Sequence, residues 1–222
     1  MPLMVKVCGL TEAPLLDQAV AGGASFVGFV FFPPSPRAIA PSEAAFLAER
    51  VPVEVQTVGV VVDPTDELLD GLLSVVPLDI LQLHGHETPE RVAAIGLRTG
   101  TRLMKAIRVE TVDDLQPLAA YAEVADMILF DAKPPRDAAW PGGHGLPFDW
   151  RLLADLRLAK PWALAGGLTP DNLAAAVELL HPPLVDVSSG VERAPGKKDP
   201  AKLGRFMEEA ARLGAWPART SR

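Results

Sequence analysis

The chain has 222 residues, of which 49% are hydrophobic, so it is long enough and apolar enough to bury a full core. Its 21 basic and 28 acidic residues give a net charge of −7, which argues against the basic surface that nucleic-acid binding requires. One cysteine cannot form an internal disulfide, and the sequence shows no N-terminal signal pattern and no long apolar run. These features predict a soluble cytoplasmic protein without nucleic-acid or membrane partners.

Short apolar runs that alternate with helix-like stretches organise the whole chain. The predicted strands are 3–8, 25–31, 55–62, 79–83, 102–107, 126–131, 161–166 and 184–188. Strands that alternate with helices pair in parallel through crossover connections, and eight such units suit closure. The sequence therefore predicts an α/β protein with a single eightfold β/α (TIM) barrel over residues 1–222, ending in a loose polar tail at 215–222. The alternative is an open doubly wound sheet, but the turn after the first strand lacks the G-x-G-x-x-G pattern.

Several helices are predicted to begin at a capping side chain. Four of these side chains directly precede a proline, which suits the first helical position: Asp63, Thr88, Thr169 and Asp199. Thr11, Thr111 and Asp149 are predicted to cap three more helices, and a further helix opens after Pro41. The two longest connections after strands, 31–37 and 133–147, are predicted to border the active face, where long loops close over ligands.

Residues with chemical side chains or exposed backbone gather at the predicted strand ends. They are Cys8, Arg37, Asp63, His84, Arg108, Asp131, Gly166, Gly167, Ser188, Ser189 and Gly190. The small residues after the last two strands expose backbone N–H groups to an anion, where many barrels hold phosphate, although glycine there also permits positive φ. Arg37, stiffened by neighbouring prolines, suits a carboxylate in two-point contact, or it is a solvated surface arginine.

Three of the strand-end side chains have open roles on the sequence alone. Cys8 is either an ionisable thiol or a small buried hydrophobe. Asp131 follows an apolar strand, where its carboxyl group either donates a proton or caps a turn. His84 is a ligand contact or a core histidine, and it does not form a metal cluster with His86, because the two point to opposite sides of an extended segment.

Six short motifs follow one another along the chain at these strand ends. They are Lys6-Val7-Cys8-Gly9-Leu10-Thr11, Ser35-Pro36-Arg37, Gln82-Leu83-His84-Gly85, Leu129-Phe130-Asp131, Ala165-Gly166-Gly167-Leu168 and Asp186-Val187-Ser188-Ser189-Gly190-Val191-Glu192. Together they resemble the signature series of the phosphoribosylanthranilate isomerase family of tryptophan biosynthesis. The chain departs from the family's usual Gly-Gly-Thr-Gly after the sixth strand, where it has Gly142-Gly143-His144-Gly145. The role of His144 is therefore open.

The resemblance implies an eightfold barrel that catalyses the Amadori rearrangement of a phosphosugar–anthranilate substrate with no cofactor and no metal. It further implies Asp131 as the acid, Cys8 as the base and Arg37 as the ligand of the substrate carboxylate. Gly166, Gly167, Ser189 and Gly190 would then bind the phosphate. His84 and Asp186 are expected to make further substrate contacts, or Asp186 to orient its neighbours. The expected oligomeric state is a monomer or a homodimer.

Three other functions compete with this interpretation. A histidine-pathway isomerase performs the same rearrangement, but that family uses two aspartates, whereas the first strand here ends in Cys8. Ribulose-phosphate epimerases also bind phosphate at the last two strands, but they need a metal whose ligand set is not found. A phosphosugar-binding module without turnover has no need of an acid and a base at separate strand ends.

Overall fold

A closed barrel of eight parallel strands forms the centre of the computed structural model, which describes residues 3–133, 142 and 148–214. The strands are β1 (Met4–Cys8), β2 (Phe26–Val30), β3 (Gln56–Val61), β4 (Ile80–Leu83), β5 (Arg102–Val109), β6 (Met127–Ala132), β7 (Trp162–Leu164) and β8 (Leu184–Val187). Each strand pairs in parallel with the next, and β1 also pairs with β8. This closure confirms the predicted barrel and rules out the open sheet.

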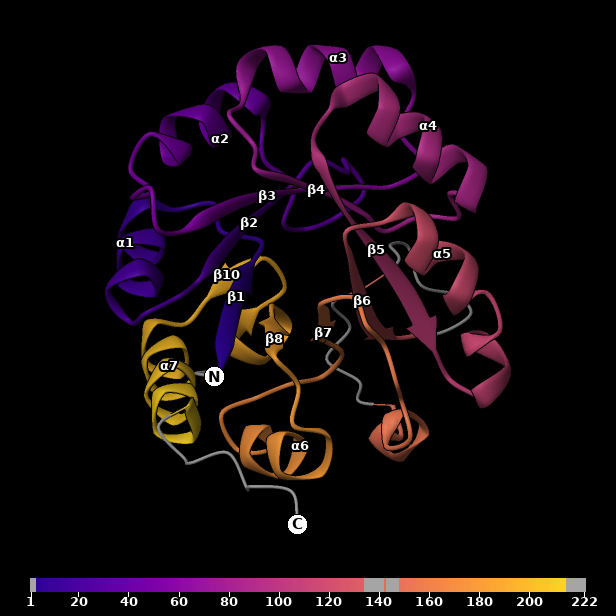
Figure 1. The fold of residues 1–222 in the computed structure, drawn as a ribbon. Coiled ribbons are helices and arrows are strands. Elements are labelled where there is room, and N and C mark those ends of the chain that lie inside the picture. Colours follow the sequence, from indigo (N-terminus) through magenta and orange to yellow (C-terminus); the bar gives the residue numbers. More distant parts are fainter. Residues whose placement is uncertain (1–2, 134–141, 143–147, 215–222) are drawn as a thin grey trace.

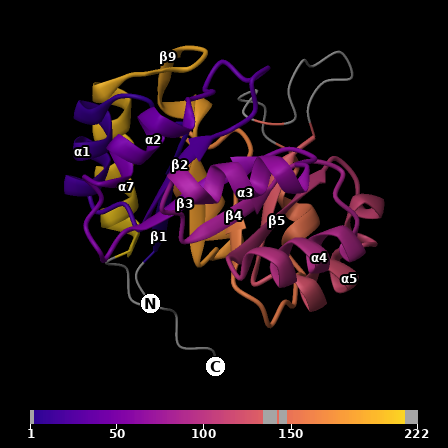
Figure 2. The same ribbon diagram turned by 90° about the horizontal axis from the view of Figure 1, so that it is seen from above.

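Helices surround the strands on the outside of the barrel (Figure 1; Figure 2). They are α1 (Ala13–Ala21), α2 (Pro41–Ala48), α3 (Asp66–Val75), α4 (Pro89–Thr99), α5 (Leu118–Val124), α6 (Leu173–Leu180) and α7 (Pro200–Gly214). The described part of the connection from β6 to β7 contains a single 3-10 turn, η2 (Trp150–Leu153), where the sequence predicted a helix. The short antiparallel pair β9 (Glu192–Ala194) and β10 (Lys197–Lys198) follows β8 and was not predicted.

Some of the predicted helix caps are confirmed by hydrogen bonds. The Thr88 hydroxyl accepts from the Arg91 N–H at 3.3 Å, and Pro89 opens α4 as expected. The Asp199 carboxylate accepts from the Ala201 N–H at 2.9 Å at the start of α7. In both cases the side chain satisfies a backbone N–H that has no partner within the helix. Asp149 caps η2 in the same way.

Three predicted caps, Asp63, Thr169 and Thr11, are wrong. For Asp63 and Thr169 the structure shows which other contact the residue makes. Thr65, not Asp63, caps α3, because Asp63 turns at φ +45° and its carboxylate accepts from the His86 N–H. Helix α6 begins at Leu173, and the Thr169 N–H instead donates to the Asn172 side chain in the preceding turn. Helix α1 begins two residues after Thr11. Thr111 precedes a 3-10 helix, η1 (Val112–Leu115), rather than α5 itself.

The barrel interior is filled by alternate side chains of its strands, as the two-residue period of a strand requires. One interior cluster contains Phe26, Val58, Ile80, Met104, Ala106, Met127, Leu129, Ala163, Ala165 and Leu184. A smaller cluster of Cys8, Val30 and Val60 lies separately from it. The apolar residues that alternate with them along the strands, such as Val5 and Val7 on β1 and Val185 and Val187 on β8, belong to the main core together with the helices. Since side chains fill the interior, a ligand can enter only at an end of the barrel.

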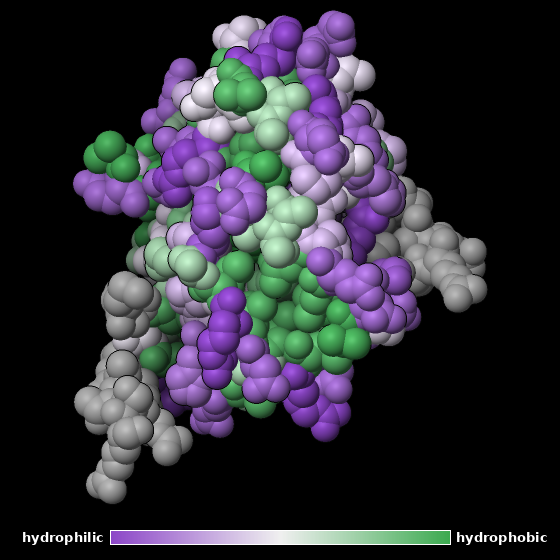
Figure 3. All heavy atoms as spheres, turned by 45° about the vertical axis from the view of Figure 1, so that its right-hand side comes forward, coloured by the Kyte–Doolittle hydropathy of each residue, from purple (hydrophilic) through white to green (hydrophobic). Residues whose placement is uncertain are grey.

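Within the described residues, no helix combines the length and apolar character needed to cross a membrane. The surface in Figure 3 mixes hydrophilic residues with a gathering of hydrophobic ones in its lower half. The predicted tail at 215–222 and most of the predicted loop at 133–147, including His144, lie outside the described residues. The part of that loop that is described, Lys133 and Gly142, lines the pocket discussed next.

Candidate active site

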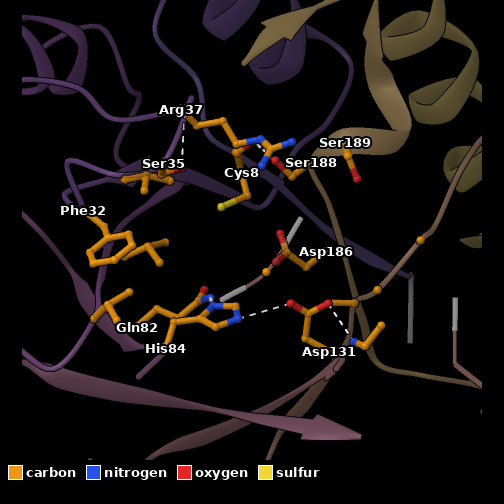
Figure 4. A pocket seen from close by; sticks show the side chains of 18 of the residues that line it. Cys8, Phe32, Ser35, Arg37, Gln82, His84, Asp131, Asp186, Ser188 and Ser189 are labelled. Carbon is orange, nitrogen blue, oxygen red and sulfur yellow. Dashed lines mark hydrogen bonds and ion pairs between the residues drawn. The ribbon is translucent and has the colours of Figure 1, made fainter. Parts of the chain in front are cut away.

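A pocket opens at the carboxyl ends of the strands, and most of the predicted site residues line it (Figure 4). Those that do are Cys8, Arg37, His84, Asp131, Gly166, Gly167, Asp186, Ser188 and Ser189. Phe32 and Ser35 of the 31–37 loop join them, as the loop length predicted. Cys8 and Asp131 lie at the ends of β1 and β6, His84 directly follows β4, and the three side chains point toward the same space (Figure 4).

Two residues predicted to converge here, Asp63 and Arg108, do not line the pocket. The Arg108 guanidinium donates to the backbone oxygen of His84 at 2.7 Å and contacts the His86 ring at 3.2 Å. Asp63 in turn binds the His86 backbone and ring. Both residues therefore belong to a network that holds the turn after β4 and, through it, the position of His84.

Asp131 is the only acidic residue of β6, and two groups hold its carboxyl group. Its Oδ2 lies 3.1 Å from His84 Nε2, and its Oδ1 accepts from the Ala132 N–H at 2.9 Å. The other ring nitrogen of His84 lies 2.8 Å from Gln82 Nε2. The His84 ring is therefore held between the side chains of Gln82 and Asp131. This geometry fixes the direction in which Asp131 faces the pocket, and it supplies the polar partner that the sequence did not reveal.

Gly142 lies directly against this pair. A Cβ atom at position 142 would lie 2.6 Å from Asp131 Oδ2 and 2.8 Å from His84 Nε2. Any side chain there would push these groups apart, because real Cβ contacts are not so short. The glycine at the start of the Gly142-Gly143-His144-Gly145 motif therefore lets the backbone approach the acid group closely.

Cys8 ends β1 beside two buried lysines, which sequence reasoning did not place in the site. Burial raises the pKa of the Cys8 thiol, and the nearby ammonium groups of Lys6 and Lys198 oppose that rise. Lys6 Nζ donates to Asp186 Oδ1 at 3.0 Å, and both side chains are almost fully buried. Asp186 therefore holds the Lys6 ammonium in addition to lining the pocket. A lysine inside the otherwise apolar strand Met4–Cys8 was the available sequence signal.

Arg37 is not a solvated surface arginine, because its side chain is only 5% exposed. Its Nε and Nη2 donate to the two carboxylate oxygens of Glu192, each at 2.8 Å. Lys198 Nζ donates to the same carboxylate at 2.9 Å and also to the backbone and hydroxyl oxygens of Ser188. Although burial opposes it, these two cations lower the pKa of Glu192 to about 2. The three side chains together carry one net positive charge at the pocket wall.

The glycines of the turn after β7 have the positive φ that the sequence allowed, whereas Gly190 after β8 does not. Gly166 and Gly167 have φ of +82° and +68°, which favour glycine. A Cβ at Gly190 would lie 1.8 Å from the Leu168 oxygen, so the two turns pack backbone to backbone. Ser189 opens a 3-10 helix, η3 (Ser189–Val191), whose first N–H groups have no partner within the helix. Gly190 itself is not among the pocket-lining residues.

In residues 3–133, 142 and 148–214 no group of three or more His, Cys, Asp or Glu side chains is arranged to hold a metal ion. The polar residues of the pocket instead divide into an acid group at Asp131, a thiol at Cys8 and a positive cluster around Arg37. Such a set can move protons and bind anions.

Comparison with known proteins identifies the family of the chain. Residues 5–209 match the family model described as N-(5'-phosphoribosyl)anthranilate (PRA) isomerase. An N-(5'-phosphoribosyl)anthranilate isomerase from Paracoccus denitrificans (strain Pd 1222) is 57% identical over 95% of this chain and 98% of its own length. One from Rhodospirillum centenum (strain ATCC 51521 / SW) is 52% identical over 96% of this chain and 100% of its own length.

Solved structures give the same result. Phosphoribosyl anthranilate isomerase from Thermotoga maritima has a TM-score of 0.83 and 37% identity, covering 94% of this chain and 98% of its own. The enzyme from Thermus thermophilus has a TM-score of 0.83 and 34% identity, covering 95% of this chain and 100% of its own. With matches of this extent in both sequence and structure, this chain belongs to the N-(5'-phosphoribosyl)anthranilate isomerase family.

Proposed function

We propose that Asp131 and Cys8 are the acid and the base of this isomerase. The reaction is the Amadori rearrangement of N-(5'-phosphoribosyl)anthranilate to 1-(o-carboxyphenylamino)-1-deoxyribulose 5-phosphate in tryptophan biosynthesis. The observation that carries the proposal is the placement of an acid group on β6 and a thiol on β1 around one pocket. A solved family member with 36% identity and a TM-score of 0.80 was crystallised with the reduced form of that product.

The chemistry needs one proton given and one proton taken. Asp131 gives its proton to the ring oxygen, the bond from that oxygen to C1′ breaks, and the nitrogen lone pair forms an iminium. The Cys8 thiolate then takes the proton from C2′, and the electron pair left behind forms the C1′–C2′ double bond of an enolamine. Tautomerisation gives the ketone. Carbon C2′ is oxidised as C1′ is reduced, so the step balances without a cofactor.

The anionic ends of the substrate suit the rest of the pocket. Arg37, held by Glu192 and backed by Lys198, is assigned to the anthranilate carboxylate, because the cluster has a net positive charge. The turns at Gly166, Gly167, Ser189 and Gly190 are assigned to the phosphate, which backbone N–H groups bind well. His84 is assigned to the positioning of Asp131, which it contacts directly.

The family match decides against the histidine-pathway and ribulose-phosphate alternatives. A binding module without turnover is separated from an enzyme by one assay. Purified protein is mixed with enzymatically generated phosphoribosylanthranilate, and the anthranilate-type fluorescence is followed. The isomerase removes this fluorescence catalytically, whereas a binding module leaves substrate present in excess unchanged.

The family also supports proposals on the oligomeric state and the cellular site. A Thermotoga maritima relative with 36% identity is a dimeric enzyme of which monomers were generated, so monomer and homodimer are both candidates for this chain. Sedimentation equilibrium distinguishes the two states. As a biosynthetic enzyme that acts on a small phosphosugar, the protein is assigned to the cytoplasm.

Inorganic phosphate and sulfate are expected to compete with the substrate. Both are tetrahedral anions, and backbone donors at the Gly166-Gly167 and Ser189-Gly190 turns recognise the anion rather than the sugar. Initial rates at increasing sulfate should show a rising KM with an unchanged kcat, while sodium chloride at the same ionic strength is the control. Equal inhibition by chloride and sulfate, or a sulfate-grown crystal with no anion at these turns, would contradict the assignment.

A further inference from the structure

Lys6 lies inside the barrel directly below the Cys8 thiol. Residues two apart on a strand share a face, and on β1 the flanking residues Val5 and Val7 pack outward in the main core. Lys6 and Cys8 therefore face the interior, where their side chains are buried. The Lys6 side chain is 0% exposed, so its ammonium cannot reach a ligand in the pocket. Its effect on the reaction must act through its neighbours.

Gly28 on β2 leaves the space that Lys6 and Cys8 share. It is the register partner of Cys8, and a Cβ built on it would lie 3.1 Å from Cys8 Sγ. The same Cβ would lie 3.4 Å from Lys6 Cε. The sulfur of Cys8 and the end of the Lys6 side chain therefore both lie over the backbone of Gly28 on β2. The absence of a side chain on Gly28 allows the ammonium to approach the sulfur.

Asp186 holds the lysine from the other neighbouring strand. It is the register partner of Lys6 on β8, and its carboxylate accepts from Lys6 Nζ at 3.0 Å. Burial alone would lower the pKa of Lys6, but the charges of Asp186 and of the Cys8 thiolate raise it. The pKa of Lys6 is raised overall, so the charged ammonium is the favoured form beside Asp186. A buried cation requires nearby negative charge, and the thiolate is the second group that can supply it.

The other charged groups near the thiol have opposing effects on the pKa of Cys8. Lys198 of β10 favours the thiolate, and Asp186 opposes it. Arg37 and Asp131 line other parts of the pocket, each bound to its own partner, Glu192 and His84. Of the nearby cations, Lys6 has the largest effect in lowering the pKa of Cys8 against burial. Burial and Asp186 hold the pKa of Cys8 above its ordinary value even with both lysines present, and loss of Lys6 would raise that pKa further.

We propose that Lys6 is a positioning residue whose buried ammonium, held by Asp186, stabilises the thiolate form of Cys8. The inference deepens the proposed function, since it concerns the base assigned above, but its test does not depend on that assignment. Cys8 is the only cysteine of the chain, so thiolate absorbance and alkylation by iodoacetamide report on this one sulfur.

The experiment compares Lys6→Met with the wild-type protein. Loss of the cation is expected to raise the pH midpoint of thiolate absorbance by about 1–3 units, the usual effect of one nearby charge. At neutral pH the alkylation rate and kcat should both fall by about tenfold or more. The acid limb of the kcat–pH profile should shift upward with the thiol. Lys6→Gln makes the same change while keeping a donor for Asp186, and it is used where Lys6→Met does not fold.

Lys105→Met and Lys105→Gln are the matched controls. Lys105 is also a buried lysine of a barrel strand with a carboxylate partner, Glu87 at 2.7 Å, but its contacts lie at the turn after β4. These variants are expected to lose stability while the thiol titrates as in the wild type. An unchanged thiol titration in the Lys6 variants would overturn the inference, as would an equal shift in the Lys105 variants. Wild-type protein without isomerase activity would instead overturn the proposed function, and the thiol titration would still decide the role of Lys6.

Discussion

Cys8→Ser is expected to lower kcat by at least ~10²-fold and up to ~10⁴-fold, the range that general acid–base assistance covers. Serine nearly preserves the volume of cysteine, so the small cluster with Val30 and Val60 should stay packed. A hydroxyl, however, is too weakly acidic to supply the conjugate base. Asp131→Asn should cause a loss of the same order, because an amide keeps the contact with His84 but cannot donate the required proton.

Binding separates these losses from damage to the fold. Both variants should bind the reduced product analogue with near wild-type affinity, measured by calorimetry, because neither side chain is assigned to an anionic end of the ligand. A purely packing role for Cys8 would instead give a loss of stability of about 1 kcal/mol on change to alanine, with activity spared. If Cys8→Ser keeps more than about a tenth of wild-type kcat, well short of this loss, the thiolate is not the base.

The barrel could be predicted from the sequence because the end of each strand is marked by the residues of that strand alone. An apolar run that stops at Cys8 or Asp131 marks both the strand and the residue that faces the active end, and parallel pairing then brings such ends together. Hence nearly all of the predicted site residues line one pocket. Gly190, Asp63 and Arg108 are the exceptions. Asp63 and Arg108 also lie near strand ends, but they are engaged with His86.

The partners of the site residues could not be predicted in the same way, because they depend on contacts between distant parts of the chain. Lys6 meets Asp186 only because β1 and β8 close the barrel. Arg37 contacts Glu192, which lies far away in the sequence. The motif that contains Glu192 therefore gave no sign that Glu192 holds Arg37. Helix starts failed for a similar reason, since Asp63 is recruited by the turn after β4 rather than by α3.

Arg37→Ala is the prediction that tests the carboxylate site. The carboxylate is present in both the ground state and the transition state, so its ligand contributes uniform binding, and its loss should raise KM far more than it lowers kcat. Removal of a charge-assisted two-point contact costs about 2–4 kcal/mol, which corresponds to a rise in KM of roughly 30-fold to 1000-fold. Steady-state kinetics and calorimetry with the reduced product analogue measure the two effects.

The fold should survive this change, because Glu192 keeps other partners. Its carboxylate still accepts from Lys198 Nζ at 2.9 Å and from the Gly196 N–H at 3.2 Å, so no uncompensated charge is buried. Arg50→Ala is the matched control: Arg50 also binds a carboxylate, that of Asp17, but both side chains are largely exposed and no effect on KM is expected. A KM for Arg37→Ala that stays at the wild-type value would remove Arg37 from the carboxylate site. A large fall in kcat with KM unchanged would mean that Arg37 acts on the transition state instead.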